Sequence, residues 1–279
     1  MTDLHWLPIV PEWRQRLTAL SQAQSPSWIE ASALSNVRLN FVLTNRLDQT
    51  IQQIFSSGPI DPTFKQVRLA LLGSSTLTHL APAVRVAGLR RGLWIETYET
   101  DYGQYLQELA DPNSALHEFS PTTVLLALDA YHLSAGVTSA MDDASAELAL
   151  HDVLQRLHSA WHEIREAFRC PIIQQTALPV HLPLLGNNEH RLPGSRARFL
   201  SQFNAALRRI AGPEGVDLLA LDDRVIRDGI ARWHDPALWH RSKQEVVPTA
   251  APMYGELVGR LLAAKQGRSY KCLVLEPLA

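Results

Sequence analysis

The chain has 279 residues, of which 46% are hydrophobic and 19% charged, and its formal net charge is −2. This length allows one large or two small domains with a packed core, and the hydrophobic content argues against a disordered chain. The near-neutral charge argues against a nucleic-acid-binding surface and against a polybasic membrane face.

The sequence also indicates where the protein works. No basic segment followed by an apolar run opens the chain, and no run reaches the roughly 18 apolar residues of a membrane span. We therefore expect a soluble, cytoplasmic protein. Two isolated cysteines, Cys170 and Cys272, are too few for a disulfide framework, and each is expected to be a small buried hydrophobe at the start of a strand.

Residues 1–60 are predicted to form a helical N-terminal appendage. Apolar residues in Trp28–Phe55 recur at helical intervals, and Ser57-Gly58-Pro59 ends the helical section. No chemistry is evident in this part of the chain.

Residues 61–267 are predicted to form one α/β domain, because strands and helices alternate from about residue 65 onward. This pattern is typical of a doubly wound, mainly parallel sheet of five strands. The predicted strands are Val67–Leu72, Trp94–Tyr98, Thr122–Leu128, Pro171–Leu178 and Val216–Leu221. The predicted helices after the second strand are Tyr102–Leu109, 142–169, 196–211 and Pro248–Lys265.

Two segments of this domain are predicted to be long loops, Pro179–Gly194 and Asp228–Lys243. Long loops on a rigid scaffold often line a site. Residues 268–279 open with Arg268-Ser269-Tyr270-Lys271-Cys272, which is typical of the first strand of a second domain.

Ligands of doubly wound sheets bind beyond the carboxyl ends of the strands, where the strand order reverses. The candidate residues at these ends are Gly73, Ser74, Ser75, Thr76, Asp129, Asp222, Asp223, His234, Asp235 and His240. Ser75 is the sharpest candidate. A serine whose amide lies at a helix N-terminus suits a nucleophile that generates an oxyanion. Helix capping is the alternative, and on residue type alone it is the favoured one.

The segment Trp233–His240 could supply a base for that serine. Asp235 would orient His240 if the segment folds back over the first strand. The alternative is a tryptophan-rich loop that packs on the sheet edge, with Asp235 capping a short turn. A third set, His151, His158 and His162, shares one face of the long helix, but no aspartate or cysteine stands at ligand spacing with it. We expect neither a metal site nor a cofactor.

The chain resembles the N-terminal region of FkbH-like proteins, whose domain has the SGNH (GDSL-type) hydrolase fold. The resemblance rests on residues 69–130 with Tyr102-Gly103-Gln104-Tyr105, and on PIIQQTALP, LLALDD, WHDPALWHRSK and RSYKCLVL. It covers most of residues 40–275. It implies an SGNH/flavodoxin-like three-layer sandwich that precedes a HAD-type phosphatase domain. The aspartyl nucleophile motif of that second domain does not follow Leu275, so we expect neither HAD chemistry nor its Mg²⁺ in this chain.

The resemblance also implies roles for individual residues. Ser75 matches the SGNH nucleophile, with Gly73 and Ser74 beside it, and Ser74 replaces the usual aspartate. Gly103 matches the oxyanion-hole glycine. Asp129 stands where the family has an asparagine, and an ionised aspartate would repel an oxyanion rather than donate to it. Asp235 and His240 are five residues apart, whereas the family pattern is Asp-x-x-His.

Two functions follow as expectations. Family members are thought to load a glyceryl unit onto an acyl carrier protein for polyketide-type assembly. In the first, favoured interpretation the domain is non-catalytic and docks an acidic carrier or the HAD-like domain, using Arg90, Arg91, Arg208 or Arg209. In the second it is an SGNH-type esterase or acyltransferase with Ser75, His240 and Asp235 as its triad.

Overall fold

The computed structural model describes residues 4–59 and 61–268. Its centre is a five-stranded sheet of order β2-β1-β3-β4-β5 in which all neighbouring strands are parallel. This confirms the predicted doubly wound α/β fold, and all five strands lie where the sequence predicts them. Their bounds are Lys65–Gly73 (β1), Leu93–Glu99 (β2), Thr123–Ala127 (β3), Ile172–Gln175 (β4) and Asp217–Leu219 (β5).

The strand register decides where the candidate site lies. Gly73, the last residue of β1, pairs with Ala127, the last residue of β3. The turns that begin at Ser74 and Leu128 therefore leave the sheet at the same level. The strand order reverses between these two strands, which is where doubly wound folds place ligands.

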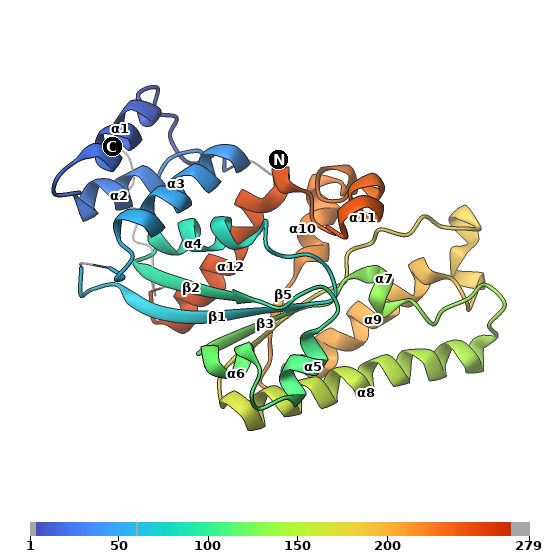
Figure 1. The fold of residues 1–279 in the computed structure, drawn as a ribbon. Coiled ribbons are helices and arrows are strands. Elements are labelled where there is room, and N and C mark those ends of the chain that lie inside the picture. Colours follow the sequence, from blue (N-terminus) through green and yellow to red (C-terminus); the bar gives the residue numbers. More distant parts are fainter. Residues whose placement is uncertain (1–3, 60, 269–279) are drawn as a thin grey trace, which may run out of the picture.

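Alternate side chains of β1 enter two separate cores. Val67, Leu69 and Leu71 pack on one face with α4, α10 and α12. Ala70 and Leu72 pack on the other face with α5, α6, α8 and α9, so the sheet lies between two helical layers (Figure 1). The bounds on the first face are Ala81–Leu89 (α4), Leu221–Asp228 (α10) and Ala251–Lys265 (α12), and those on the second are Tyr105–Ala110 (α5), Ala115–Phe119 (α6), Asp143–Phe168 (α8) and Arg196–Ala211 (α9).

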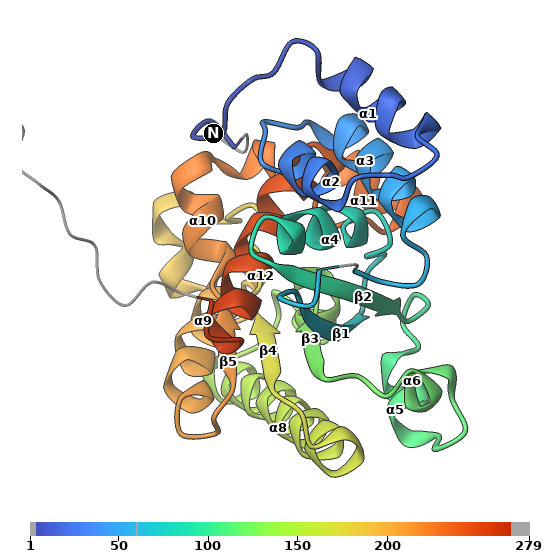
Figure 2. The ribbon, with the colours of Figure 1, turned by 90° about the vertical axis from the view of Figure 1, so that its left-hand side faces the viewer.

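Three helices precede the sheet and lie over α4 (Figure 2). They are Trp13–Gln22 (α1), Trp28–Ser35 (α2) and Phe41–Ile54 (α3). The apolar spacing of Trp28–Phe55 thus covers two helices rather than one, because the chain breaks after α2 and Asn40 caps α3 through the amide of Leu43. Trp28 packs against Trp94 of β2, with ring centroids 5.8 Å apart.

The predicted loop Asp228–Lys243 is wrong in part, because it contains the 3-10 turn η2 (Ile230–Arg232) and the helix α11 (Pro236–Ser242). The other predicted loop, Pro179–Gly194, contains only the 3-10 turn η1 (Gly186–Arg191). A short helix, α7 (Ala130–Leu133), follows β3, and the 3-10 turn η3 (Pro248–Ala250) precedes α12.

The predicted boundary between an appendage of residues 1–60 and a domain of residues 61–267 stays a prediction. The predicted opening of a second domain, residues 268–279, lies outside the described residues apart from Arg268. Within the described range, no helix is both long enough and apolar enough to cross a bilayer.

Candidate functional site

Residues 242–246, which follow the predicted segment Trp233–His240, lie over the turn after β1. The amide of Thr76 donates to the carbonyl of Lys243 at 2.9 Å, and the Thr76 hydroxyl donates to the carbonyl of Ser242 at 2.9 Å. His79 Nε2 lies 2.7 Å from the carbonyl of Val246. Because a carbonyl only accepts, Nε2 carries the proton that joins the two segments.

Ser74 and Asp129 form a buried pair at the ends of β1 and β3. The Ser74 hydroxyl donates to Asp129 Oδ2 at 2.5 Å and accepts the Asp129 amide at 2.9 Å. The other oxygen of Asp129 accepts the amide of His132 at 2.9 Å and so caps α7. The Asp129 carboxyl is therefore committed to Ser74 and to the helix start.

A second carboxyl, Glu245, lies beside this pair and was missed by the sequence reasoning. It is buried, and its Oε1 accepts the amide of Ala130 at 2.7 Å. Burial raises the pKa of Asp129, and burial together with the charge of Asp129 raises the pKa of Glu245 well above its ordinary value. Two neighbouring buried carboxyls resist double ionisation, so the site favours retaining a proton at neutral pH.

His234 is the histidine that the structure brings to the sheet edge. Its Nδ1 lies 2.8 Å from the carbonyl of Glu245, and its Nε2 lies 3.1 Å from the hydroxyl of Tyr131. Burial lowers the pKa of His234, which favours the neutral ring. Since Nδ1 must donate to the carbonyl, the neutral Nε2 accepts the Tyr131 proton. Tyr131 in turn stacks on Trp239, with centroids 4.3 Å apart.

The three predicted catalytic residues are not joined to one another. Ser75 is buried, and no hydrogen bond links it to a histidine within the described chain. Asp235 accepts the amide of Ala237 and caps α11, which is the alternative that the sequence analysis left open. His240 is exposed in the last turn of α11. The catalytic roles of these residues stay predictions.

The amide of Ser75 was predicted to lie at a helix N-terminus, and the structure places no helix start at this residue. Helix α4 begins at Ala81, so five residues separate the serine from the first helical residue. A Cβ at Gly73 would lie 2.6 Å from Leu77 Cδ1 and 3.1 Å from the carbonyl oxygen of Ala127, so a larger residue there would crowd the neighbouring strand. Gly103 has a φ of +73° and lies in the exposed loop after β2. Its oxyanion role stays a prediction.

Three of the four arginines expected to bind a carrier are engaged within the chain. Arg90 and Arg91 both pair with the buried Glu256, and the side chain of Arg90 is only 5% exposed. The two guanidinium groups are therefore held inside the fold by one buried carboxylate. Arg208 pairs with Asp222 and Asp223, the acidic residues that follow β5.

The metal hypothesis finds no support around the long helix. His158 of α8 lies 3.8 Å from a Glu214 oxygen, and no group of three or more His, Cys, Asp or Glu side chains in the described ranges could hold a metal ion. Asp222 is instead satisfied by Thr176 at 2.7 Å and Asn204 at 3.0 Å, besides its arginine.

Solved structures with a similar fold include a phosphatase-containing protein and two lipases. The N-terminal part of a Bacteroides fragilis protein, containing a phosphatase domain and complexed with Mg, aligns at a TM-score of 0.68 and 18% identity. The alignment covers 82% of this chain and 57% of that one, so the chain spans little more than half of its relative. The identity is low enough that the likeness concerns the fold alone.

A lipase/acylhydrolase from Enterococcus faecalis aligns at a TM-score of 0.46 and 13% identity, over 71% of this chain and 96% of that one. A GDSL-like lipase from Bacteroides thetaiotaomicron aligns at 0.43 and 11% identity, over 71% and 88%. None of the curated proteins compared with the chain matches it significantly.

The family assignment comes from the sequence itself. A family profile described as "FkbH, N-terminal domain" matches residues 68–239, which run from β1 through the Ser74–Asp129 pair to α11. The match spans more than half of the chain and includes most of the polar cluster at the sheet edge. The chain belongs to the FkbH N-terminal domain family.

Proposed function

We propose that this chain is a cytoplasmic recognition domain of an FkbH-like protein. It handles a glyceryl or other acyl unit destined for an acyl carrier protein in polyketide-type biosynthesis, by docking the carrier or the HAD-like partner domain. The observation that carries the proposal is the state of His234. The Nε2 lone pair that would accept a serine proton in an SGNH hydrolase accepts the Tyr131 hydroxyl here.

The oxyanion side of the site supports the same conclusion. In the family pattern an asparagine donates to the oxyanion, but Asp129 stands at this position and accepts from Ser74 and from the amide of His132. Neither of its oxygens is left to donate a hydrogen bond outward when it is ionised. His234 and Asp129 are thus both engaged in contacts that hold the sheet edge together.

A docking surface lies in the Pro179–Gly194 segment that follows β4. Leu182, Leu184 and Leu185 are exposed there to 84%, 65% and 50%. Arg191 and Arg196 are exposed nearby, and neither forms an ion pair with another described residue. Exposed leucines beside arginines without an acidic partner fit an acidic protein surface with an apolar centre, such as a carrier helix.

The alternative function is an active SGNH-type esterase or acyltransferase that uses Ser75. It is favoured by one observation: the Ser75 hydroxyl has no hydrogen-bond partner among the described side chains that would commit it to a structural role. This alternative requires His240 or His234 to move onto Ser75 when substrate binds.

A covalent probe separates the two functions. The chain and its Ser75→Ala variant are exposed to a fluorophosphonate, and intact mass is measured after folding is confirmed by circular dichroism. The docking proposal expects no adduct in either protein. A stoichiometric adduct in the unmodified chain alone would overturn it and make Ser75 an activated nucleophile.

Binding to an acidic carrier protein is the direct test of docking. We expect Ser75→Ala to bind as the unmodified chain does, and the double change Arg191→Glu with Arg196→Glu to weaken binding about tenfold or more. Arg14→Glu is the matched control, because Arg14 is exposed on α1 outside the proposed surface and is not among the arginines expected to bind the carrier. Equal binding by the double variant would remove this surface from the proposal.

A further inference from the structure

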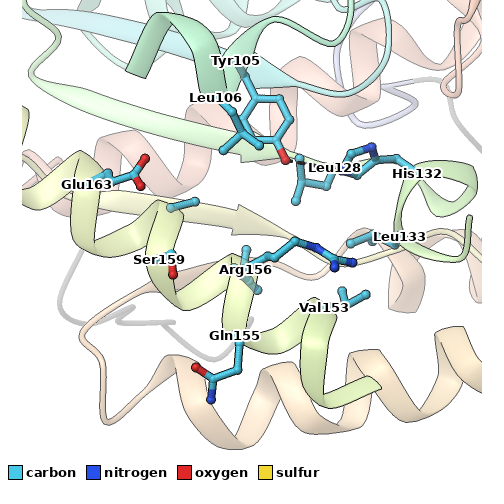
Figure 3. A pocket seen from close by; sticks show the side chains of 12 residues that line it. Tyr105, Leu106, Leu128, His132, Leu133, Val153, Gln155, Arg156, Ser159 and Glu163 are labelled. Atoms are coloured by element: carbon cyan, nitrogen blue, oxygen red, sulfur yellow. Dashed lines mark hydrogen bonds between the residues drawn. The ribbon is translucent and has the colours of Figure 1, made fainter. Parts of the chain in front are cut away.

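A cavity of about 380 Å³ lies between α5, the end of β3, α7 and α8. Figure 3 shows Tyr105 and Leu106 descending into it from α5, and residues of α8 forming the opposite wall. Its walls are mainly apolar, with Leu128, Val153 and Leu157 among them. The volume falls in the range of small-molecule sites, and an apolar lining favours an apolar ligand segment.

Arg156, an exposed residue of α8, lines this cavity and places a positive charge beside its apolar walls. Its side chain extends along the cavity from α8 toward His132 and Leu133 (Figure 3). No acidic side chain in residues 4–59 and 61–268 forms an ion pair with it. A guanidinium without a partner beside apolar walls matches a carboxylate in both charge and geometry, since it can donate two parallel hydrogen bonds.

Two further polar groups lie at the same end of the cavity. The Tyr105 hydroxyl and His132 Nε2 are 3.3 Å apart, and the two rings meet edge to face. Desolvation by the surrounding side chains lowers the pKa of His132; the charge of Asp129 opposes this shift, and the charge of Arg156 adds to it. A neutral histidine and a tyrosine can orient a carboxylate without competing for its charge.

The opposite end of the cavity limits the charge of the ligand. Glu163 lines that end, two helical turns from Arg156 and so about 10 Å along α8. A carboxylate there would repel a second negative charge on the ligand. The cavity therefore favours one anionic end group near Arg156 and an uncharged remainder.

We propose that this cavity binds an anionic amphiphile, a monocarboxylate with an unbranched apolar tail. The carboxylate pairs with Arg156 next to His132 and Tyr105, and the tail lies along Leu106, Leu128 and Leu157. The site is separate from the proposed docking surface and does not depend on carrier binding. A small-molecule ligand is thereby proposed for a part of the chain that plays no role in the proposed function.

Calorimetric titration of the full chain with octanoate tests the proposal. We expect one binding site, with octanol weaker because it lacks the charge and suberate weaker because its second carboxylate lies toward Glu163. Arg156→Gln should weaken octanoate binding about tenfold or more, the effect of losing a charged hydrogen-bonded pair. No binding by the unmodified chain, or equal binding of octanoate and octanol, would overturn the proposal.

Two more variants make the test specific to this cavity. Leu106→Glu places a carboxylate on a wall residue that is 44% exposed, so the fold tolerates it while octanoate should be repelled. Arg209→Gln removes an exposed arginine away from the cavity and should bind octanoate unchanged. Arg156→Gln that binds as tightly as Arg209→Gln would show that octanoate occupies another place.

Discussion

The two buried carboxyls at the sheet edge, Glu245 and Asp129, differ in how well hydrogen bonds compensate their ionised forms. Glu245 is 2% exposed and accepts only one backbone amide among the described residues, so its ionised form is poorly compensated. Asp129 accepts a hydroxyl on one carboxyl oxygen and an amide on the other, which makes it the better compensated of the two. Asp129 is therefore the carboxyl of the pair that ionises, and Glu245 is the one that keeps its proton.

This difference predicts an unusual pH dependence of stability. Burial and the charge of Asp129 raise the pKa of Glu245 well above its ordinary value of 4.5. Between that value and the raised one, the folded protein binds more protons than the unfolded chain, so the free energy of unfolding falls as pH rises. The contribution approaches about 1.4 kcal/mol per pH unit for one proton.

Glu245→Gln removes the titrating group and keeps an oxygen for the Ala130 amide. We expect urea unfolding at about pH 5 and about pH 8 to show a smaller loss of stability in this variant than in the unmodified chain. Tyr131 and Tyr254 also sense the Glu245 charge, but burial raises the pKa of both above this range. Glu147→Gln, at an exposed position of α8, is the control. Parallel pH profiles of Glu245→Gln and the unmodified chain would contradict the prediction.

Secondary-structure elements could be predicted where the spacing of apolar residues within the segment itself indicates the element. Helix α8 was expected over 142–169 and spans Asp143–Phe168, because Val153, Leu157, Trp161 and Ile164 mark one apolar face over many turns. Helix α11 was missed because only Trp239 of its seven residues is buried, which leaves no apolar period in the sequence.

The candidate site was predictable in its position but not in its contacts. Parallel strands place the turns after β1 and β3 at one edge, so Ser74 and Asp129 were expected together. Glu245 was missed because its partner, the amide of Ala130, is 115 positions away along the chain. The ion pair of Arg91 with Glu256 spans 165 positions and was missed for the same reason.

Contact between α4 and α12 depends on a glycine that lets the helices approach closely. A Cβ at Gly255 would lie 2.3 Å from the backbone carbon and oxygen of Ala83. Replacing glycine with alanine in a helix gains about 1 kcal/mol of propensity, but overpacking a core typically costs about 1–3 kcal/mol. The cost of overpacking exceeds the gain in helix propensity here, because backbone atoms cannot move away from the new Cβ as a flexible side chain can.

We therefore expect Gly255→Ala to lower the free energy of unfolding by about 1–2 kcal/mol in a denaturant titration. Gly212→Ala is the matched control, since Gly212 has a φ of −61° and a Cβ added there would meet no other atom within 4 Å. The control should be neutral or slightly stabilising. A stabilised Gly255→Ala protein would mean that α4 and α12 separate easily.

At the scale of the whole molecule, the N-terminal helices share a core with the sheet domain. Side chains of α1, α2 and α3 form one apolar cluster with Val86 and Leu89 of α4 and with Trp94 of β2. Asp48 of α3 also binds Arg85 of α4 through two hydrogen bonds, of 2.8 and 2.6 Å. These contacts indicate that α1–α3 and the sheet unfold as one unit.

Asp48 offers the sharpest test of this cooperativity. Its side chain is 6% exposed and that of Arg85 is 20% exposed, so Asp48→Ala leaves a largely buried guanidinium unpaired. Breaking such a pair costs about 3–5 kcal/mol when fully buried, and we expect about 2–4 here because Arg85 keeps some solvent contact. Glu30→Ala, which breaks the more exposed pair with Arg16, should cost about 1 kcal/mol or less.

Hydrogen exchange measures which parts of the chain lose stability in the Asp48→Ala variant. If α1–α3 and the sheet open together, Asp48→Ala lowers the opening free energy of amides in α3 and in β1 by the same amount. Arg85 also donates a hydrogen bond to Thr97 of β2, so the loss of Asp48 affects a side chain that contacts the sheet directly. Faster exchange in α1–α3 with unchanged protection in β1 would instead show that the N-terminal helices open on their own, as an appendage would.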